Sequence, residues 1–263
     1  MTVMAPRSTA ADLVRAAAVL VLAVLQIVVA GLGGSGRIGD GVGVVAADNP
    51  TPLLAAGWAF SIWSVIYLGF LAYAVYAVLP SQRSRPAHRR TGWWLAVSAV
   101  LNPLWILAFG NRHMIAAEVV ILLLLVVLAA VYGRLSHEPA RGTTEQLAFR
   151  LPIALYAGWV SLATVLGTAA TGVAEGLPGD GVLALAAAVT ALLATAAIVC
   201  WVVSSATAVV GYAAATVWGL IGIATNDRPP AVGVTALLAA ALIAIVTTRR
   251  VLRSVESRRV ALG

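Results

Sequence analysis

Residues 60–79 read FSIWSVIYLGFLAYAVYAVL, a run of apolar and aromatic residues without a single charged side chain. At 1.5 Å per residue, a helix of about 20 residues crosses the roughly 30 Å of hydrocarbon in a bilayer. Apolar residues make up 61% of the whole chain and charged residues only 10%, which is far from the composition of a soluble domain. The sequence therefore predicts an integral membrane protein built from helices.

Similar runs recur along the chain and predict an all-α, polytopic membrane helical bundle. We expect about eight transmembrane helices, near residues 13–32, 52–79, 92–110, 114–133, 147–170, 182–203, 206–225 and 230–248. The first run is long for the apolar part of a cleaved signal peptide, so we expect a retained helix. The uncharged stretch between Asp180 and Asp227 is compatible with one buried segment or with two helices.

The distribution of arginine decides between these two possibilities. All 17 basic residues are arginines, and an even number of spans with a cytoplasmic N-terminus leaves only Arg37, Arg112 and Arg228 outside. Basic loops are retained in the cytoplasm. We therefore favour a hairpin near Ser204-Ser205 and expect a multi-pass protein of the cell membrane with both termini cytoplasmic. Arginines in short loops beside the spans favour anionic membrane lipid over nucleic acid as their partner.

The chain divides by composition into two parts. Residues 1–171 contain the first five spans, and residues 172–263 contain three more spans, rich in Ala, Val, Leu and Thr, with a basic cytoplasmic tail. In the second part Gly211, Ala215 and Gly219 recur every four residues. Such a stripe of small residues lets another helix approach closely, so we interpret this part as packing.

Three polar segments connect the predicted spans. The outer loop from Gly33 to Pro52 is rich in glycine, and we expect it to be flexible and to act as a lid. The loops from Pro80 to Arg90 and from Gly133 to Gln146 carry many charged or polar residues. We expect both to be solvated cytoplasmic connectors.

Three spans carry tryptophan on a face defined by three- and four-residue spacing. The residues that share these faces are Phe60, Trp63, Tyr67 and Phe70 in the second span, Asn102, Trp105 and Phe109 in the third, and Tyr156, Trp159, Ala163 and Leu166 in the fifth. Pro103 weakens the third helix beside Asn102, and Ala163 leaves space one turn from Trp159. Together the faces predict the walls of a flat, mostly apolar cavity, although aromatic faces also form ordinary helix cores.

The titratable residues give little support for catalysis. Glu118 is the only carboxylate inside an apolar run, and it either couples ion movement or reaches the outer headgroups or Arg112. His88, His113 and His137 lie in or beside loops, and the sequence has no cysteine cluster, phosphate-binding loop or nucleophile elbow. We expect no enzyme activity, no catalytic residue, no metal site and no resident cofactor.

The three tryptophan motifs resemble those of the TspO/MBR family, the tryptophan-rich sensory proteins or translocator proteins. Trp63-x-x-x-Tyr67 is similar to the W-x-x-L-Y of the family's second helix, and Leu101-Asn102-x-x-Trp105 to the L-N-x-x-W of its third. Pro152 with the segment from Trp159 to Thr164 is similar to the P-Y-L-x-W-V-x-F-A-T of its fifth. The resemblance covers roughly residues 12 to 170, and the three C-terminal spans are extra to the family's usual plan.

The resemblance implies a five-helix bundle, often a homodimer, that binds porphyrins and other flat hydrophobic molecules in a pocket toward the first loop. It implies that the pocket is lined by Trp63, Tyr67, Asn102, Trp105, Trp159 and Ala163. The chain departs from the family pattern in that first loop, which keeps only Asn49-Pro50-Thr51-Pro52 of the signature. Gly167 replaces the asparagine that ends the fifth-helix motif, and the sterol-recognition Tyr and Arg are missing.

We therefore expect a membrane ligand-binding protein that acts as a sensor or carrier of a porphyrin-like or other flat hydrophobic molecule. Two alternatives remain at this point. One is a secondary transporter that uses Glu118 as its coupling residue. The other is a membrane scaffold whose helices of small residues bind a partner protein.

Overall fold

The computed structural model describes residues 8–227 and 229–263, and the elements within them are helices. In chain order they are α1 (Ala10–Gly34), α2 (Val42–Asp48), η1 (Gly57–Ser61), α3 (Ile62–Val78), α4 (Pro86–Gly110), α5 (Met114–Ser136), α6 (Thr143–Glu145), η2 (Gln146–Arg150), α7 (Leu151–Ala174), α8 (Gly181–Ser205), α9 (Val209–Ala224), α10 (Pro230–Arg253) and α11 (Ser257–Leu262). Arg7 and Arg228, which entered the topology prediction, lie outside the described residues.

The prediction of an all-α polytopic membrane bundle is confirmed. In the described part of the chain, seven helices are long and apolar enough to cross a membrane. The remaining predicted span, at residues 206–225, is the shorter helix α9, of 16 residues. The uncharged stretch does form two helices, because α8 ends at Ser205 and α9 begins at Val209. Ala208 makes the turn between them with a φ of 56°.

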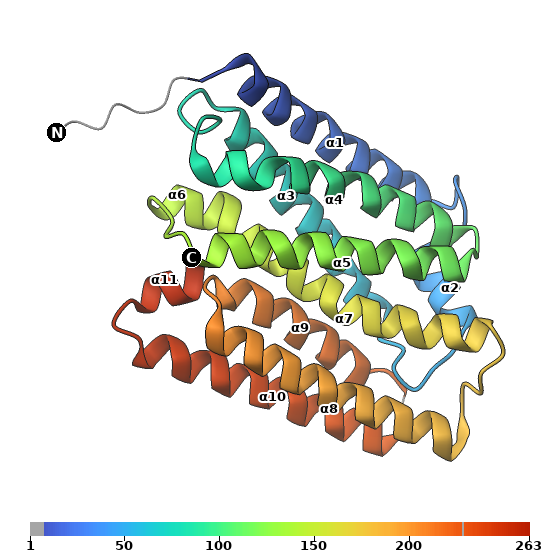
Figure 1. Cartoon of the computed structure of the whole chain (residues 1–263). Helices are drawn as coiled ribbons and strands as arrows, with labels where there is room; N and C mark the ends of the chain where they lie inside the picture. The colour runs from blue at the N-terminus through green and yellow to red at the C-terminus, as the bar shows by residue number, and fades with distance from the viewer. Residues whose placement is uncertain (1–7, 228) are drawn as a thin grey trace.

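The long helices lie side by side, with α1 at one edge of the bundle and α8, α9 and α10 at the other (Figure 1). The beginning and the end of the described chain lie at the same end of the bundle. There Arg15 of α1 donates to the carbonyl oxygen of Arg83, and the side chain of Gln146 donates to the carbonyl oxygen of Gly263. An even number of crossings produces this arrangement.

Helix α9 packs closely on α7 because glycines on both helices let the backbones approach. A Cβ atom added at Gly158 of α7 would lie 2.2 Å from the carbonyl oxygen of Tyr212. On α9, a Cβ at Gly211 would lie 2.7 Å from a carbonyl oxygen of α7, and one at Gly219 would lie 2.3 Å from Leu162. The predicted stripe of small residues is therefore a helix-packing surface, and it joins the two parts of the chain. The boundary at residue 171 stays a prediction.

The start of the fifth membrane span is locally widened. Residues Gln146–Arg150 form a π-helical turn, η2, directly before α7. Pro152 has no N–H group to donate to the carbonyl of residue 148, and its ring presses against that turn. A widened turn relieves the conflict. It also turns Phe149 and Arg150 into the protein, where both are at most 2% exposed.

The expectation of a solvated connector holds for most of the segment from Gly133 to Gln146 but not for its end. Glu145 and Gln146, near the end of that segment, are 3% and 7% exposed. Glu145 accepts hydrogen bonds from Arg85 and Arg150, at 3.0 Å and 2.8 Å for the closest contacts. His88 lies in the first turn of α4, beside the preceding loop, and its ring is stacked on Phe149 with 4.7 Å between ring centroids. Polar residues in this region are therefore part of the packed interior.

Candidate ligand-binding site

A small, partly enclosed cavity lies between α3, α4 and α7 at the end of the bundle opposite the termini, which we call the outer end in keeping with the predicted topology. Its volume is about 40 Å³, which is space for only a few water molecules. The walls are mostly apolar and aromatic. They are formed by Val42, Ala46, Asn49, Thr51, Leu54, Ala55, Phe60, Trp63, Trp105, Phe109, Trp159, Ala163, Leu166, Gly167 and Ala170.

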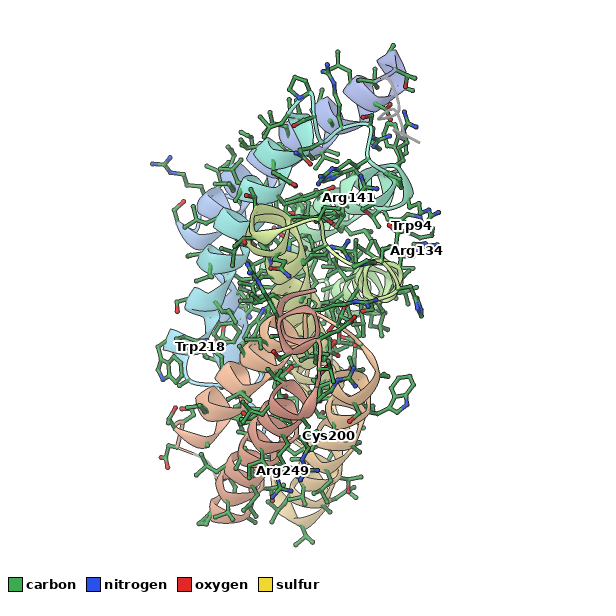
Figure 2. The ribbon with its side chains drawn as sticks, turned by 90° about the vertical axis from the view of Figure 1, so that its left-hand side faces the viewer. Trp94, Arg134, Arg141, Cys200, Trp218 and Arg249 are labelled. Carbon is green, nitrogen blue, oxygen red and sulfur yellow. The ribbon has the colours of Figure 1, made fainter. Side chains whose placement is uncertain are left out.

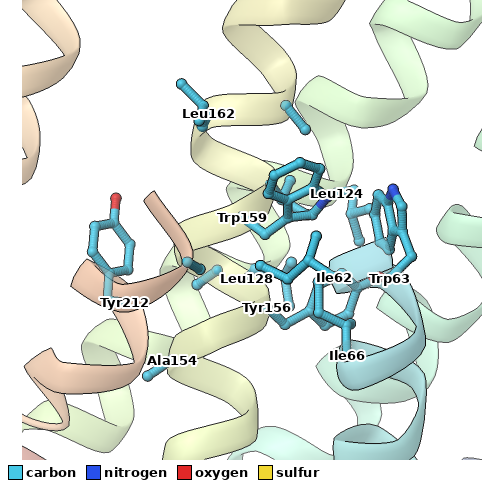
Figure 3. Packing of buried hydrophobic residues seen from close by; sticks show 14 of the residues in the cluster. Ile62, Trp63, Ile66, Leu124, Leu128, Ala154, Tyr156, Trp159, Leu162 and Tyr212 are labelled. Atoms are coloured by element: carbon cyan, nitrogen blue, oxygen red, sulfur yellow. The ribbon is translucent and has the colours of Figure 1, made fainter. Parts of the chain in front are cut away.

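Trp63 is at the centre of the aromatic cluster beside this cavity. Its ring centroid is 5.4 Å from that of Trp105, 6.1 Å from that of Trp159 and 6.1 Å from that of Tyr156. Figure 3 shows the Trp63 and Trp159 rings side by side, with Tyr156 below them. The Trp159 ring meets the Trp63 ring at 87°, an edge-to-face geometry that aromatic pairs favour.

The structure brings four of the six predicted site residues to one cavity, namely Trp63, Trp105, Trp159 and Ala163. All four are at most 9% exposed. Their convergence follows from the helical spacing, because each lies on the aromatic face of its own helix. The side chains therefore face the protein interior and not the lipid.

The other two predicted residues lie next to the cavity and do not line it. Tyr67 lines an open groove between α1 and α3, and its hydroxyl donates to Asn102 Oδ1 at 3.2 Å. Asn102 is fully buried, and its Nδ2 has no hydrogen-bond partner. Trp159 Nε1 is also buried and unpaired. Buried donors without partners cost free energy, so the outer half of the bundle contains unused hydrogen-bonding capacity.

The loop between α1 and α3 covers the cavity from the outer side. The sequence predicted it to be a flexible lid, but part of it forms helix α2, in which Val45 is fully buried and Ala46 is 7% exposed. Asn49 and Thr51, which belong to the retained part of the family signature, line the cavity. The cover is therefore a folded part of the site.

Arg112 connects this cover to the turn between α4 and α5. Its guanidinium donates to Asp48 at 2.6 Å and to Asp40 at 2.7 Å. Hydrogen bonds to Asp48 and to Asp40 raise the pKa of Arg112. The Arg112 guanidinium therefore stays charged in both ion pairs at any physiological pH. The amide of Asp40 also donates to the carbonyl oxygen of Gly110, at 2.9 Å.

Helix α9 supports the cavity from the other side. Trp218 Nε1 donates to the carbonyl oxygen of Ala59 in η1 at 2.8 Å, and the Trp218 ring meets the Trp58 ring at a centroid distance of 4.7 Å. Figure 2 shows Trp218 on the opposite side of the bundle from Trp94 and Arg134. No local pattern in the sequence indicates these contacts, because Trp218 lies far along the chain from Trp58 and Ala59.

Glu118 lies on α5 against α7, behind the cavity wall. Its Oε1 accepts a hydrogen bond from Thr168 Oγ1 at 2.5 Å. Its Oε2 would lie 2.8 Å from a Cβ atom added at Gly167, which lines the cavity. The suggested contact between Glu118 and Arg112 is not formed, since Arg112 binds the two aspartates. The glutamate carboxylate occupies the space that a larger residue at position 167 would need.

These features define the class of protein. It is a polytopic α-helical membrane protein with a tryptophan-walled cavity beneath a folded outer loop. A family model described as TSPO-like protein matches residues 16–249, so the chain belongs to the TSPO-like family. The match extends through α8, α9 and most of α10. It therefore goes beyond the first five spans, which contain the three sequence motifs. No curated protein and no solved structure matched the chain.

Proposed function

We propose that this TSPO-like membrane protein binds porphyrin-like or other flat hydrophobic molecules and acts as their sensor or carrier without covalent catalysis. One observation carries the proposal: Trp63, Trp105 and Trp159 come from three different helices and enclose one cavity. Aromatic rings offer large, rigid apolar faces that suit a flat ligand.

The polar atoms of the site suit a ligand with a few hydrogen-bonding groups. The indole N–H of Trp159 and the Nδ2 group of Asn102 are both buried donors without partners. A ligand that presents a carbonyl or carboxylate oxygen to such a donor removes the cost of leaving it unpaired. Specificity in mostly apolar pockets commonly comes from a small number of such groups.

The cavity must widen before it accepts a molecule of this size. Ligand pockets usually measure roughly 300–1,000 Å³, whereas the enclosed space measures about 40 Å³. The aromatic rings that form its walls pack on one another without a covalent bond or an ion pair. We therefore expect the rings to separate when a ligand binds.

A porphyrin titration of the purified protein, followed by tryptophan fluorescence, tests the proposal. Ala163→Phe places a ring in the cavity, and we expect it to weaken porphyrin binding by at least about tenfold while costing about 1–3 kcal/mol of stability. Ala129→Phe on the exposed face of α5 is the matched control, and we expect parental affinity. If a folded Ala163→Phe protein binds as tightly as the parent, the ligand does not use this cavity.

We also propose that the protein resides in the cell membrane with both termini in the cytoplasm. The two ends of the described chain lie at one end of the bundle, where arginines such as Arg15, Arg85 and Arg150 gather. Reporter fusions after residue 263 and in the 172–181 loop are expected to label opposite sides of the membrane. Labelling on one side would contradict the eight crossings.

A further inference from the structure

Two spaces of very different size share one wall. The enclosed cavity measures about 40 Å³ and the open groove between α1 and α3 about 720 Å³. Four residues line both of them: Val42, Phe60, Trp63 and Trp105. Only side chains therefore separate the closed cavity from a space large enough for a flat ligand.

The groove opens on the lateral surface of the bundle. On its α3 wall Ser64 and Leu68 are exposed, the latter by 66%. On its α1 wall, Gly31 and Gly34 are exposed, and a Cβ atom added at either would meet no atom within 4 Å. Because both helices have the length and composition of membrane spans, we infer that this part of the opening faces the hydrocarbon of the outer leaflet, while the loop residues Asp40 and Gly41 line its outermost part.

Trp63 is the part of the shared wall that is best placed to move. It is the second residue of α3, which follows directly on the 3₁₀ helix η1. A 3₁₀ turn has poorer hydrogen-bond geometry than an α-helix, and a Cβ atom added at Gly57, at the start of η1, would meet no atom within 4 Å. A rotation of Trp63 toward the groove would expose the unpaired Trp159 Nε1 to the incoming molecule.

The outer cover is fastened much more firmly than this side wall. Arg112 holds Asp40 and Asp48, as described above. At the other end of the cover, the amide of Ala56 donates to the carbonyl oxygen of Gly222 at 2.8 Å, and Asn226 Nδ2 donates to that of Leu54 at 3.0 Å. Opening the cover would break all of these contacts, whereas opening the side wall would break only ring contacts.

We propose that the ligand enters sideways from the outer leaflet, through the groove between α1 and α3, and that Trp63 is the gate. The occupant of the groove is the same flat apolar molecule, dissolved in the lipid, on its way to the cavity. This inference rests on the proposed function. It adds the route, the gate and the membrane as the source of the ligand.

The rate of binding tests the route. The protein is reconstituted in lipid nanodiscs, and stopped-flow tryptophan fluorescence follows the binding of protoporphyrin. Gly31→Leu fills the groove from α1, and Ser64→Leu fills it from α3. We expect each to slow association by at least about tenfold, with a much smaller change in equilibrium affinity, since blocking a route slows passage in both directions.

Two control variants separate the lateral route from the alternatives. Gly133→Leu adds the same side chain at a glycine of α5 that also has open space around it, and we expect parental rates. Asp48→Asn removes one ion pair of the cover. It would speed association if the ligand entered beneath the cover, and the lateral route predicts no change.

The outcomes distinguish this inference from the proposed function. Parental association rates in both Gly31→Leu and Ser64→Leu, or faster association in Asp48→Asn, overturn the lateral route. If the parent still binds and Ala163→Phe does not, the cavity assignment survives that result. A parent protein that does not bind protoporphyrin overturns both.

Discussion

The outer end of the bundle and the end that carries the termini, which we propose to be cytoplasmic, differ in their buried charges, although both contain buried polar atoms without partners, such as the His88 ring nitrogens at the cytoplasmic end. At the outer end, Asn102 Nδ2 and Trp159 Nε1 are buried without partners beside a cavity. At the cytoplasmic end, the buried charges Asp12, Arg15, Arg150 and Glu145 are joined in ion pairs. Unpaired donors beside a cavity suit a binding site, whereas buried charges held in ion pairs suit a fixed structure.

The cytoplasmic network ties together segments that are distant in the sequence. Asp12 of α1 accepts hydrogen bonds from Arg15 at 2.9 Å and from Arg89 of α4 at 2.6 Å for the closest contact. Arg150 binds Glu145 and donates to the carbonyl oxygens of Leu135 and Glu138. The C-terminal helix α11 joins the same end through Arg258, which donates to Gln146.

The largest effect is expected at the cytoplasmic end. Arg150→Met removes a buried cation and leaves Glu145 with Arg85 as its remaining basic partner. We expect a loss of about 3 kcal/mol in the free energy of unfolding, because a buried carboxylate that loses part of its pairing is strongly destabilised. Unfolding in detergent, followed by circular dichroism, measures this loss.

Arg141→Met is the matched control for that prediction, since the Arg141 side chain is exposed. Its effect is expected to stay within about 0.5 kcal/mol. The folded Arg150→Met protein is also expected to bind porphyrin with parental affinity, because the cavity lies at the other end. A loss of affinity without a loss of stability would contradict the division between the two ends.

A smaller effect on stability is expected for the buried amide at the outer end. Asn102→Leu removes an unpaired Nδ2 group and an acceptor for the Tyr67 hydroxyl. We expect the free energy of unfolding to change by less than about 1 kcal/mol, and porphyrin affinity to fall about fivefold if the amide bonds the ligand.

Ser98→Ala provides the comparison for this amide. Ser98 is fully buried one turn away on α4, and its hydroxyl is already satisfied by the carbonyl oxygen of Leu95 at 2.8 Å. We expect unchanged porphyrin affinity. If Asn102→Leu destabilises the fold as much as Arg150→Met does, the outer amide is structural and the contrast between the two ends fails.

Much of the site at the outer end could be predicted from the sequence, whereas little of the ion-pair network at the cytoplasmic end could. The outer site depends on periodicity within single helices: Trp63, Trp105 and Trp159 each lie on an aromatic face that the sequence displays. Membrane helices in turn follow from runs without charge. The convergence of four of the six predicted residues on the cavity could therefore be predicted without any knowledge of the tertiary structure.

The parts that could not be predicted depend on contacts between distant segments. Arg112 contacts Asp40 and Asp48 from 72 and 64 residues away, and no local pattern indicates such a pair. Helix α2 is a single short element without an extended apolar period, so its segment resembled a flexible loop. Glu145 lies in the predicted solvated connector and Arg150 at the start of the fifth predicted span, and the local sequence reveals neither the π-helical turn between them nor their ion pair.

The smallest effect is expected at Glu118, and it is the one that separates binding from coupled transport. Glu118→Gln keeps an oxygen that accepts the hydrogen bond from Thr168, and it keeps the side-chain volume next to Gly167. We expect stability to change by less than about 0.5 kcal/mol and porphyrin binding to remain at the parental level. Glu175→Gln, at the exposed end of α7, is the control for charge loss alone.

Proteoliposomes with a pH gradient across the membrane measure the same variants for coupled uptake of porphyrin. A carboxylate that carries the coupling proton cannot be replaced by an amide, because the amide does not titrate. Loss of gradient-driven uptake in Glu118→Gln, with uptake retained in Glu175→Gln, would establish the transporter. Equal uptake in the two variants and the parent leaves Glu118 as a side chain that fills the space beside Gly167, so the outer end of the bundle works through its aromatic cavity and not through a titrating carboxylate.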